Sequence, residues 1–599
     1  MAAPARFGPA RWVIAAPDPA LVATVAAAAG VPRPVAEALV NRGVTDAASA
    51  ATFLEPRLAD LNDPLRMRDM DLAVARTVRA IEAGERVCVH GDYDADGLTA
   101  TALLSCFFEA VGAPVATHVP DRFRDGYGLS ADRVRAMAAE GVKLAITVDC
   151  GVTAVDEVVL ARALGVDVVV LDHHQPGGAL PDAVAVVDPH RADCGFPFKD
   201  LSAAGIAFYF AGAVRRALVS AGRLADKAVD LRPLLDLAAI GTIADVVPLL
   251  GDNRVLAAAG VRRLNESPRL GLVALKAVAG IGGGKPVTSG NVAFQLAPRL
   301  NATGRLGDAA ASLSLLLARD PEEAKRYAEA LDRENSARRG VEAGVLASAV
   351  AQVEAAGGAT HRIVIAAGDG WHPGVVGIVA SRLVERYCRP AVVIGIEDDM
   401  ARGSCRSVRG FDIGQALARV GGLLVRHGGH AMAAGLTLHA ARLADLFDAL
   451  HALADREVPD ESLVPSVRVD AVVRPEEADE ALLAAIARLQ PFGMGNPEPV
   501  LALLDVPVRE SRRVGAGQEH VQLRLGEGAT PLRAIWFEAS DQPRPGSRVD
   551  VAFTLSADDM AGGPRLKVKD VRPATAADRG MPAEAPPTAP GGLAGEGAA

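Results

Sequence analysis

Several signals are missing from this chain of 599 residues, and each absence excludes a class of protein. Its six cysteines are scattered, without a C-x-x-C pair, which predicts free thiols in a reducing cytosol. The longest apolar run, 201–214, matches a core helix and is too short to span a membrane. The N-terminus lacks the basic and compact apolar segments of a secretory signal. We therefore expect a cytoplasmic protein with no membrane segment.

The chain also lacks a surplus of positive charge, since its net charge is −10. That value gives no global sign of nucleic-acid binding, although a large enzyme can bind a polyanion through one basic groove and its metals. Hydrophobic residues make up 50% of the sequence, and its 60 glycines are typical of an α/β protein with a buried core. The length alone predicts about four domains.

One acidic stretch, 87–99, reads Val-Cys-Val-His-Gly-Asp-Tyr-Asp-Ala-Asp-Gly-Leu-Thr. Its apolar start predicts the end of a buried strand, and the apolar run after it predicts a helix capped by Asp96. Alternate residues of an extended segment point the same way, so Asp92, Asp94 and Asp96 are expected to converge. Carboxylates this close repel one another unless a cation lies among them, which predicts a hard divalent metal.

Two other interpretations of the acidic stretch need to be compared with a metal site. An EF-hand calcium loop opens in the same way but requires Glu at its twelfth position, where this chain has Leu103. A strand-like segment also stands before it in place of a helix. We therefore set the calcium loop aside. A plain acidic surface turn stays open on this motif alone.

The chain from residue 86 alternates short β-rich runs with helical segments, which predicts a mostly parallel sheet covered on both faces. Ligands of such sheets bind beyond the carboxyl ends of the strands. The predicted strands are 86–90, 115–119, 143–148, 167–171 and 183–187, and the predicted helices are 99–111, 130–140 and 154–164.

Metal-capable residues follow the ends of these elements. Asp149 follows one strand, Asp172-His173-His174 follows another, and Asp245 ends a helical stretch. One such cluster is commonly structural, but four at one edge of a sheet favour a dinuclear site of carboxylates and histidine. This ligand type suits Mn²⁺, with Mg²⁺ as the abundant alternative, and its lack of thiolates argues against structural zinc.

These motifs resemble the DHH phosphoesterase superfamily in order and spacing. The resemblance extends from about residue 35 to 575 and is strongest to the single-strand-specific exonucleases of that superfamily. Cys405 and Ala203 stand where glycines are usual, and both are small. The motifs are Asp92-x-Asp94-x-Asp96-Gly97, Thr147-Val148-Asp149-x-Gly151, Asp172-His173-His174 and Gly241-Thr242-Ile243-Ala244-Asp245, followed by the segments 298–305, 371–378, 403–407, 428–430 and 491–497.

The resemblance implies roles for the metal-capable residues. Asp149 is our choice for the carboxylate that bridges two ions, because two-metal hydrolysis needs one shared ligand. Asp94 is then expected at the first metal, and Asp96, His173 and Asp245 at the second. The role of Asp92 stays open between ligation and holding a water, with His90 as its supporting neighbour. His174 should point away from His173 along an extended chain and act on the scissile phosphate or in proton transfer.

The resemblance also implies a substrate path. We expect Arg122, Arg299, Asn301 and Arg305 to contact substrate phosphates, with His430 as a further donor. Arg305, Ser404 and Arg406 are expected to hold a terminal 5′ phosphate, which would set the direction of cleavage. Glycine-rich turns near these residues let backbone amides approach a phosphate.

Alternating short strands near the C-terminus predict an OB-type barrel, a fold that often binds single strands. Arg509, Arg512, Arg513, Arg524 and Trp536 are candidate contacts there. The alternative, that Trp536 lies in the core and the arginines are solvated edges, stays equally open.

The expected architecture is thus a multidomain α/β protein. Its predicted parts are an N-terminal helical lead-in (1–80), a parallel-sheet DHH catalytic domain (81–306), a connecting helix (307–357), a second α/β domain of DHHA1 type that binds substrate (358–455), an OB-type barrel (456–575) and a disordered tail (576–599).

The expected function is a metal-dependent exonuclease that degrades single-stranded DNA from 5′ to 3′ in repair and recombination. The resemblance implies a monomer, with a single-strand-binding protein and a RecQ-type helicase as partners. Within enzymes, a phosphodiesterase for cyclic dinucleotides or very short RNAs shares the DHH and DHHA1 parts, but it needs neither the segment 491–497 nor a barrel. A catalytically silent DNA-binding scaffold is disfavoured by the intact ligand set.

Overall fold

The computed structural model describes residues 10–121, 125–282, 286–306, 309–528, 531–558 and 562–574. It divides the chain into two compact units. The central unit comprises Thr52–Arg339 and Gln490–Pro497, and the terminal unit comprises Met1–Ala51, Gly340–Leu489 and Glu498–Ala599. The boundary between Ala51 and Thr52 falls inside the predicted lead-in 1–80. That segment is therefore divided between the two units.

The central unit is built on five parallel strands in the order β3-β2-β4-β5-β6. Because β3 lies on one side of β2 and β4 on the other, the strand order reverses beside β2. Loops leaving neighbouring strands diverge at such a point and open a crevice at their carboxyl ends. The strands are β2 (Val87–His90), β3 (Ala116–His118), β4 (Leu144–Val148), β5 (Asp167–Leu171) and β6 (Ala185–Val187).

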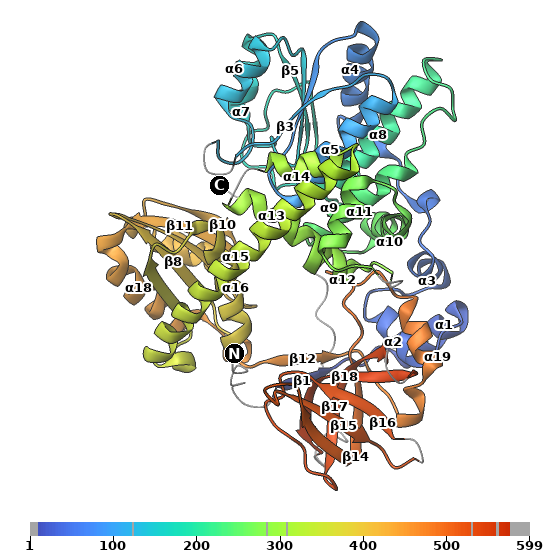
Figure 1. The fold of residues 1–599 in the computed structure, drawn as a ribbon, viewed down its shortest axis with the longest axis vertical. Coiled ribbons are helices and arrows are strands. Elements are labelled where there is room, and N and C mark those ends of the chain that lie inside the picture. The colour runs from blue at the N-terminus through green and yellow to red at the C-terminus, as the bar shows by residue number, and fades with distance from the viewer. Residues whose placement is uncertain are drawn as a thin grey trace. The chain divides into compact units, whose positions relative to one another are not determined.

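Helices cover both faces of this sheet (Figure 1). Alternate strand residues such as Val87 and Val89 pack against α5, α8 and α9, whereas Cys88 packs with α6 and α7 on the opposite face. Burial of both faces explains the near-continuous apolar strands. These helices are α5 (Ala95–Ala110), α6 (Ala131–Ala139), α7 (Val155–Ala163), α8 (Ala203–Ser220) and α9 (Leu235–Ala244).

Further helices complete the central unit and lead out of it. The predicted connecting helix is two helices, α14 and α15, and the division between the units falls inside α15. They are α4 (Met70–Ala83), α10 (Gly251–Glu266), α11 (Leu270–Val278), α12 (Ser289–Asn291), a π-helical turn (Val292–Leu296), α13 (Ala297–Leu306), α14 (Ala310–Leu317) and α15 (Pro321–Ala355).

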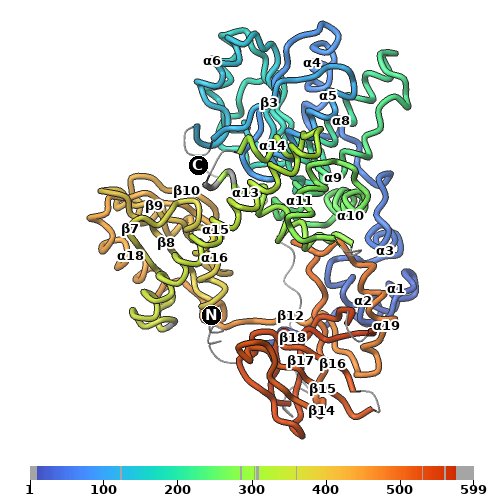
Figure 2. Tube along the Cα trace, in the orientation of Figure 1, coloured from blue at the N-terminus to red at the C-terminus, as the bar shows by residue number. Residues whose placement is uncertain are grey.

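The segment Gln490–Pro497 returns to the central unit from far along the chain. Ser289 Oγ donates to the Phe492 carbonyl at 2.6 Å, and the Leu249 amide donates to the Met494 carbonyl at 2.8 Å. Gly493 is required there, because a Cβ would lie 2.6 Å from the Leu249 side chain. These contacts bind the segment to α12 and to the residues just before α10, and its course can be followed in Figure 2.

The terminal unit contains a five-stranded mixed sheet in the order β10-β11-β9-β8-β7. One apolar layer lies between this sheet and α15 with α16, and another lies between it and α17 with α18. The elements are β7 (Val364–Asp369), α16 (Pro373–Tyr387), β8 (Ala391–Glu397), β9 (Met400–Arg406), α17 (Ile413–Arg419), β10 (Arg426–His430), β11 (Ala433–His439) and α18 (Leu443–Glu457).

The C-terminal strands form a closed barrel, because β14 pairs with both β15 and β17. This confirms the predicted OB-type fold. Trp536 is 3% exposed, so of the two interpretations left open for it, the barrel core is the one that the structure supports. The strands are β13 (Ala471–Val472), β14 (Leu501–Val514), β15 (His520–Leu525), β16 (Leu532–Trp536), β17 (Arg548–Ala557) and β18 (Pro564–Pro573), and α19 (Glu480–Ala487) lies between β13 and β14 in the chain.

Residues near the N-terminus fold with this barrel. The strand β1 (Arg11–Ile14), which the sequence did not suggest, pairs in parallel with β12 (Ser466–Val469). Trp12 Nε1 donates to Asp570 at 2.8 Å, and Arg42 forms an ion pair with Asp470 at 3.1 Å. The helices that follow β1 are α1 (Pro19–Ala29), α2 (Arg33–Val40) and α3 (Ala47–Leu54).

Among the described residues, no helix taken singly has both the length and the apolar character needed to cross a membrane. One pair bent by 112°, α1 with α2, meets those requirements only when the two are taken together.

Candidate metal centre

The acidic stretch leaves β2 and turns directly into α5. Asp94 is the N-cap of that helix, and its carboxylate accepts hydrogen bonds from the amides of Asp96 at 2.9 Å and Gly97 at 3.1 Å. The prediction that Asp96 caps the helix is therefore wrong, because Asp96 lies within the first turn. Gly97 is required, since a Cβ would lie 2.6 Å from the Asp92 nitrogen.

The acidic side chains separate into two groups. Asp92 and Asp94 have ligand atoms within 4.8 Å of Asp149, and Asp96 is grouped in the same way with His173 and Asp245. Asp149 Oδ1 lies 3.0 Å from His173 Nε2, which joins the two groups. The side chains predicted as ligands therefore lie close together, with Asp149 beside both groups.

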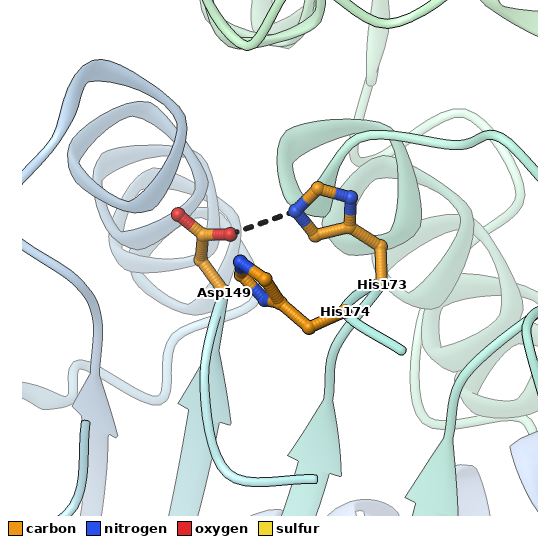
Figure 3. A group of neighbouring side chains, drawn as sticks. All are labelled: Asp149, His173 and His174. Carbon is orange, nitrogen blue, oxygen red and sulfur yellow. Dashed lines mark hydrogen bonds and ion pairs between the residues drawn. The ribbon is translucent and has the colours of Figure 1, made fainter. Parts of the chain in front are cut away.

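The backbone at Asp149 is left-handed, with φ of 65°. Such a conformation is uncommon for a residue other than glycine and is often found at functional sites. Asp149 comes directly after β4, and its carbonyl accepts a hydrogen bond from the Tyr127 hydroxyl at 3.0 Å. Figure 3 shows the Asp149 carboxylate directed at the His173 ring beyond the strand tips.

Asp96 is fixed by the start of α8. Its two carboxylate oxygens accept from the amides of Ala203 at 2.7 Å and Ala204 at 2.9 Å. Gly241 on α9 faces the same carboxylate, and a Cβ there would lie 2.4 Å from Asp96 Oδ1. A glycine is therefore necessary where α9 passes Asp96, one turn before Asp245.

Electrostatics in the site favour a bound cation. Burial and neighbouring carboxylates raise the pKa of Asp149 well above its usual value and the pKa values of Asp96 and Asp245 to about 7. Burial lowers the pKa of His173, which keeps the imidazole in the neutral form that binds metals. Perturbed carboxylates gathered in a crevice indicate a functional site.

The first residue of the Asp-His-His motif organises its neighbours. Asp172 accepts from the amides of Val152 and His173, and His174 Nδ1 lies 2.8 Å from Asp172 Oδ1. Burial opposes protonation of His174, but this hydrogen bond prevails and raises the pKa of His174 to about 9. Asp172 therefore fixes the orientation of the His174 ring at the centre.

His174 does not point away from His173 as the extended-chain prediction assumed. The two ring centroids are 4.6 Å apart, and a nitrogen of each lies within 4.8 Å of the Asp149 carboxylate. Both rings are drawn beside Asp149 in Figure 3. The turn after β5 brings both histidines to one site.

His90 does not support Asp92 directly. Its Nε2 lies 3.2 Å from the Gly128 carbonyl, and its Nδ1 lies 3.1 Å from His118 Nδ1, so both ring nitrogens are engaged elsewhere. His118 and Tyr127 are residues that sequence reasoning missed. The signal for Tyr127 was its position between two glycines, Gly126 and Gly128, both of which have φ of 83°.

The predicted phosphate contacts have different surroundings. Arg299 Nε forms an ion pair with Asp332 on α15 at 2.9 Å, which weakens its assignment to substrate. Asn301 Oδ1 accepts from the Ala95 amide at 2.7 Å and thereby attaches α13 to the start of α5. Arg122 lies outside the described residues, as does the side chain of Arg305.

A separate group lies in the mixed sheet of the terminal unit. Arg406 Nη1 donates to Ser404 Oγ at 3.0 Å and to the Cys405 carbonyl at 2.8 Å. A Cβ at Gly377 on α16 would lie 3.3 Å from Arg406 Nη2, so the glycine leaves room for the guanidinium group. His430 lies on the exposed edge strand β10.

Comparisons with known proteins agree with the order of the domains. Family models match the DHH family N-terminal domain over residues 86–242, the DHHA1 domain over 360–456 and the RecJ OB domain over 469–570. The chain is 39% identical to the single-stranded-DNA-specific exonuclease RecJ of Bacillus subtilis (strain 168), with 94% of this chain and 70% of that protein covered. The chain belongs to the RecJ family.

Other RecJ proteins are similarly identical to this chain over most of its length. RecJ of Escherichia coli (strain K12) is 36% identical over 84% of this chain and 90% of its own length. The crystal structure of RecJ from Thermus thermophilus in complex with Mn²⁺ has a TM-score of 0.81 at 33% identity, covering 94% of this chain and 80% of that one. The Mg²⁺ complex of the same RecJ gives a TM-score of 0.75 at 31% identity, covering 94% and 79%. Membership of the RecJ family therefore extends over nearly the whole chain.

Proposed function

We propose that this chain is a two-metal exonuclease that degrades single-stranded DNA from the 5′ end to 5′-mononucleotides, in DNA repair and recombination. The observation that carries the proposal is the pair of ligand groups joined at Asp149, in a chain of the RecJ family. Such a nuclease works where chromosomal DNA is found, which supports the cytoplasm as its location. A single-strand-binding protein and a RecQ-type helicase stay predictions as partners.

The donor set fits Mn²⁺ or Mg²⁺. Asp92, Asp94 and Asp149 offer oxygen atoms only, whereas Asp96 and Asp245 are joined by the imidazole of His173. Hard divalent ions prefer carboxylate oxygen, and Mn²⁺ also accepts imidazole. The raised pKa of Asp149 is the expected signature of carboxylates arranged for a cation. The first group would hold one ion, the second group the other, and Asp149 would contact both.

Two bound divalent ions supply a nucleophile at neutral pH and stabilise the charge that develops on the phosphate. The residues around them perform the remaining work. Asp172 holds His174 with Nδ1 protonated, which leaves Nε2 for the scissile phosphate. Held in this way, His174 can donate to the phosphate oxygens or pass a proton to the leaving oxygen.

Direction requires recognition of one strand end. Arg406 and Ser404 are suited to a terminal phosphate, because the bonds described for the Arg406 guanidinium go to neutral oxygens and not to a carboxylate. An anchored 5′ phosphate would place the next phosphodiester for cleavage. The barrel supports a longer single strand over a dinucleotide as substrate.

The decisive experiment follows strands labelled at either end, with and without a 5′ phosphate, in Mn²⁺. We expect mononucleotide release from the 5′ end, with duplex and cyclic dinucleotide left intact. Asp149→Ala should abolish hydrolysis and retain binding of single-stranded DNA, whereas Asp156→Ala, in the first turn of α7, serves as the matched control. Release from the 3′ end, preference for the dinucleotide, or parent-like activity of Asp149→Ala would contradict the proposal.

A further inference from the structure

Two histidines form a pair at the carboxyl ends of neighbouring strands, on the sheet face covered by α6 and α7. His90 and His118 are register partners in the β2–β3 ladder. Their rings are nearly parallel, at 8°, with centroids 5.0 Å apart and Nδ1 atoms 3.1 Å apart. His90 is 1% exposed, so its two nitrogens depend on protein partners.

Only one placement of protons satisfies this pair. The Gly128 carbonyl is an acceptor, so His90 Nε2, which lies 3.2 Å away, must carry a proton and donate. His90 is buried, and a neutral imidazole that donates from Nε2 offers Nδ1 as an acceptor. His118 Nδ1 must then carry the proton between the rings. The hydrogen bonds run in one direction, from His118 to His90 to Gly128.

The carbonyl held in this way belongs to a turn with little conformational preference of its own. Tyr127 lies between Gly126 and Gly128, both left-handed, and glycine has no Cβ to restrict its neighbours. The Tyr127 residue is 51% exposed, so packing alone does not fix its ring. The His90 bond at Gly128 is therefore a point of attachment immediately after Tyr127.

Tyr127 reaches the metal centre with its hydroxyl group. The hydroxyl donates to the Asp149 carbonyl at 3.0 Å, and His174 Nδ1 lies 3.2 Å from the same oxygen. The Nδ1 proton of His174 is thus shared between Asp172 and Tyr127. One phenol contacts the left-handed backbone of the bridging aspartate and the histidine that faces the phosphate.

We propose that His118 and His90 are positioning residues that act through Gly128 to fix Tyr127 against Asp149 and His174. Neither imidazole touches substrate or metal in this role. His118 sets which nitrogen of His90 accepts, His90 holds the turn, and Tyr127 transmits that placement to the centre. The inference rests on the proposed nuclease function only for its activity measurements.

The test compares His118→Leu, which removes the donor, with His118→Asn, whose amide can replace Nδ1–H. In the full chain with Mn²⁺, His118→Leu should lower kcat about 10-fold, the low end for losing a group that orients a site. The KM for single-stranded DNA should change less than about twofold, because the outer strand contacts are untouched. His118→Asn should stay near the parent. Thr117→Val, on the opposite face of β3, is the matched control and should also stay near the parent.

Two further measurements separate positioning from general damage. His118→Leu combined with Tyr127→Phe should be no slower than Tyr127→Phe alone, because both changes break one chain of contacts. Amide hydrogen exchange of the peptide 125–133 should be faster in His118→Leu, and this readout does not require nuclease activity. Unchanged exchange, a parent-like kcat in His118→Leu, or multiplied losses in the double variant would overturn the proposal. If the parent has no nuclease activity but His118→Leu still exchanges faster, the proposed function is overturned, whereas the attachment of the turn through His90 and Gly128 is supported.

Discussion

Asp188 follows β6, and its buried carboxyl group makes the stability of the folded state depend on pH. The His190 amide donates to Asp188 Oδ1 at 2.7 Å, while Oδ2 is buried without a hydrogen-bond partner among the described residues. Asp188 is 0% exposed, and burial raises its pKa from the ordinary 3.8 to about 7. Replacing Asp188 by Asn keeps an oxygen for the His190 amide and removes the ionisation.

The sign and size of the effect follow from proton linkage. The unfolded carboxyl group releases its proton near pH 4 and the folded one near pH 7, so the folded state loses stability as pH rises between these values. A difference of about three pKa units corresponds to about 4 kcal/mol, of which about 1.5 kcal/mol is already lost at pH 5. Relative to the parent, Asp188→Asn should therefore gain up to about 3 kcal/mol between pH 5 and pH 8.

Thermal unfolding of the parent and variant at pH 5 and pH 8, with a chelator present, measures this difference. We expect the variant's gain in Tm to be larger at pH 8 by roughly 4–5 °C, given the size of the central unit. Asp200→Asn is the control, because the Asp200 side chain is 54% exposed in the same neighbourhood. An equal change in Tm at both pH values, or a gain confined to pH 5, would refute the assignment of a raised pKa to Asp188.

Three further predictions concern the metal centre and the phosphate group. Mn²⁺ at 100 times its Kd should raise the free energy of unfolding of the parent by about 2.7 kcal/mol, seen as a higher Tm, and Asp149→Ala should remove that shift. Gly241→Ala should cost roughly 1–3 kcal/mol and weaken Mn²⁺ binding, because its Cβ would lie 2.4 Å from Asp96 Oδ1. Gly344→Ala, inside α15 with open space around it, should not lower Tm, because alanine favours a helix more than glycine does. Arg406→Ala should abolish the preference for 5′-phosphorylated strands in competition assays, and an unchanged preference would exclude Arg406 from end recognition.

Much of the central sheet could be predicted from sequence, because strands buried on both faces appear in the sequence as short apolar runs with polar clusters at their ends. The strand 167–171 agrees with β5 at both ends, and the acidic groups gather where parallel strand ends must meet. The pairing of Asp96 with Asp245 required more than spacing, because it depends on α9 passing Asp96 at Gly241.

The remaining errors have physical causes. The alternating carboxylates predict an extended segment through Asp96, whereas Asp94 caps the amides of the first turn of α5 and the helix begins at Ala95. His90 was assigned by proximity to Asp92, but the side chain of a strand residue points to a face of the sheet, where His118 is its neighbour. β1 was missed because its partner β12 lies more than 450 residues away in the chain. A local sequence pattern cannot show a pairing between two strands that lie so far apart in the chain.

The terminal unit contains residues from both ends of the described chain, and this has a consequence for its synthesis. Residues 10–51 emerge from the ribosome first, yet β1 has no partner until β12 has been made, and Trp12 has none until Asp570. At roughly 5–20 residues per second, the wait from residue 51 to the end of β18 is about half a minute to two minutes. The central unit can finish most of its sheet during that interval. During that interval β1 is without the strand that completes its sheet.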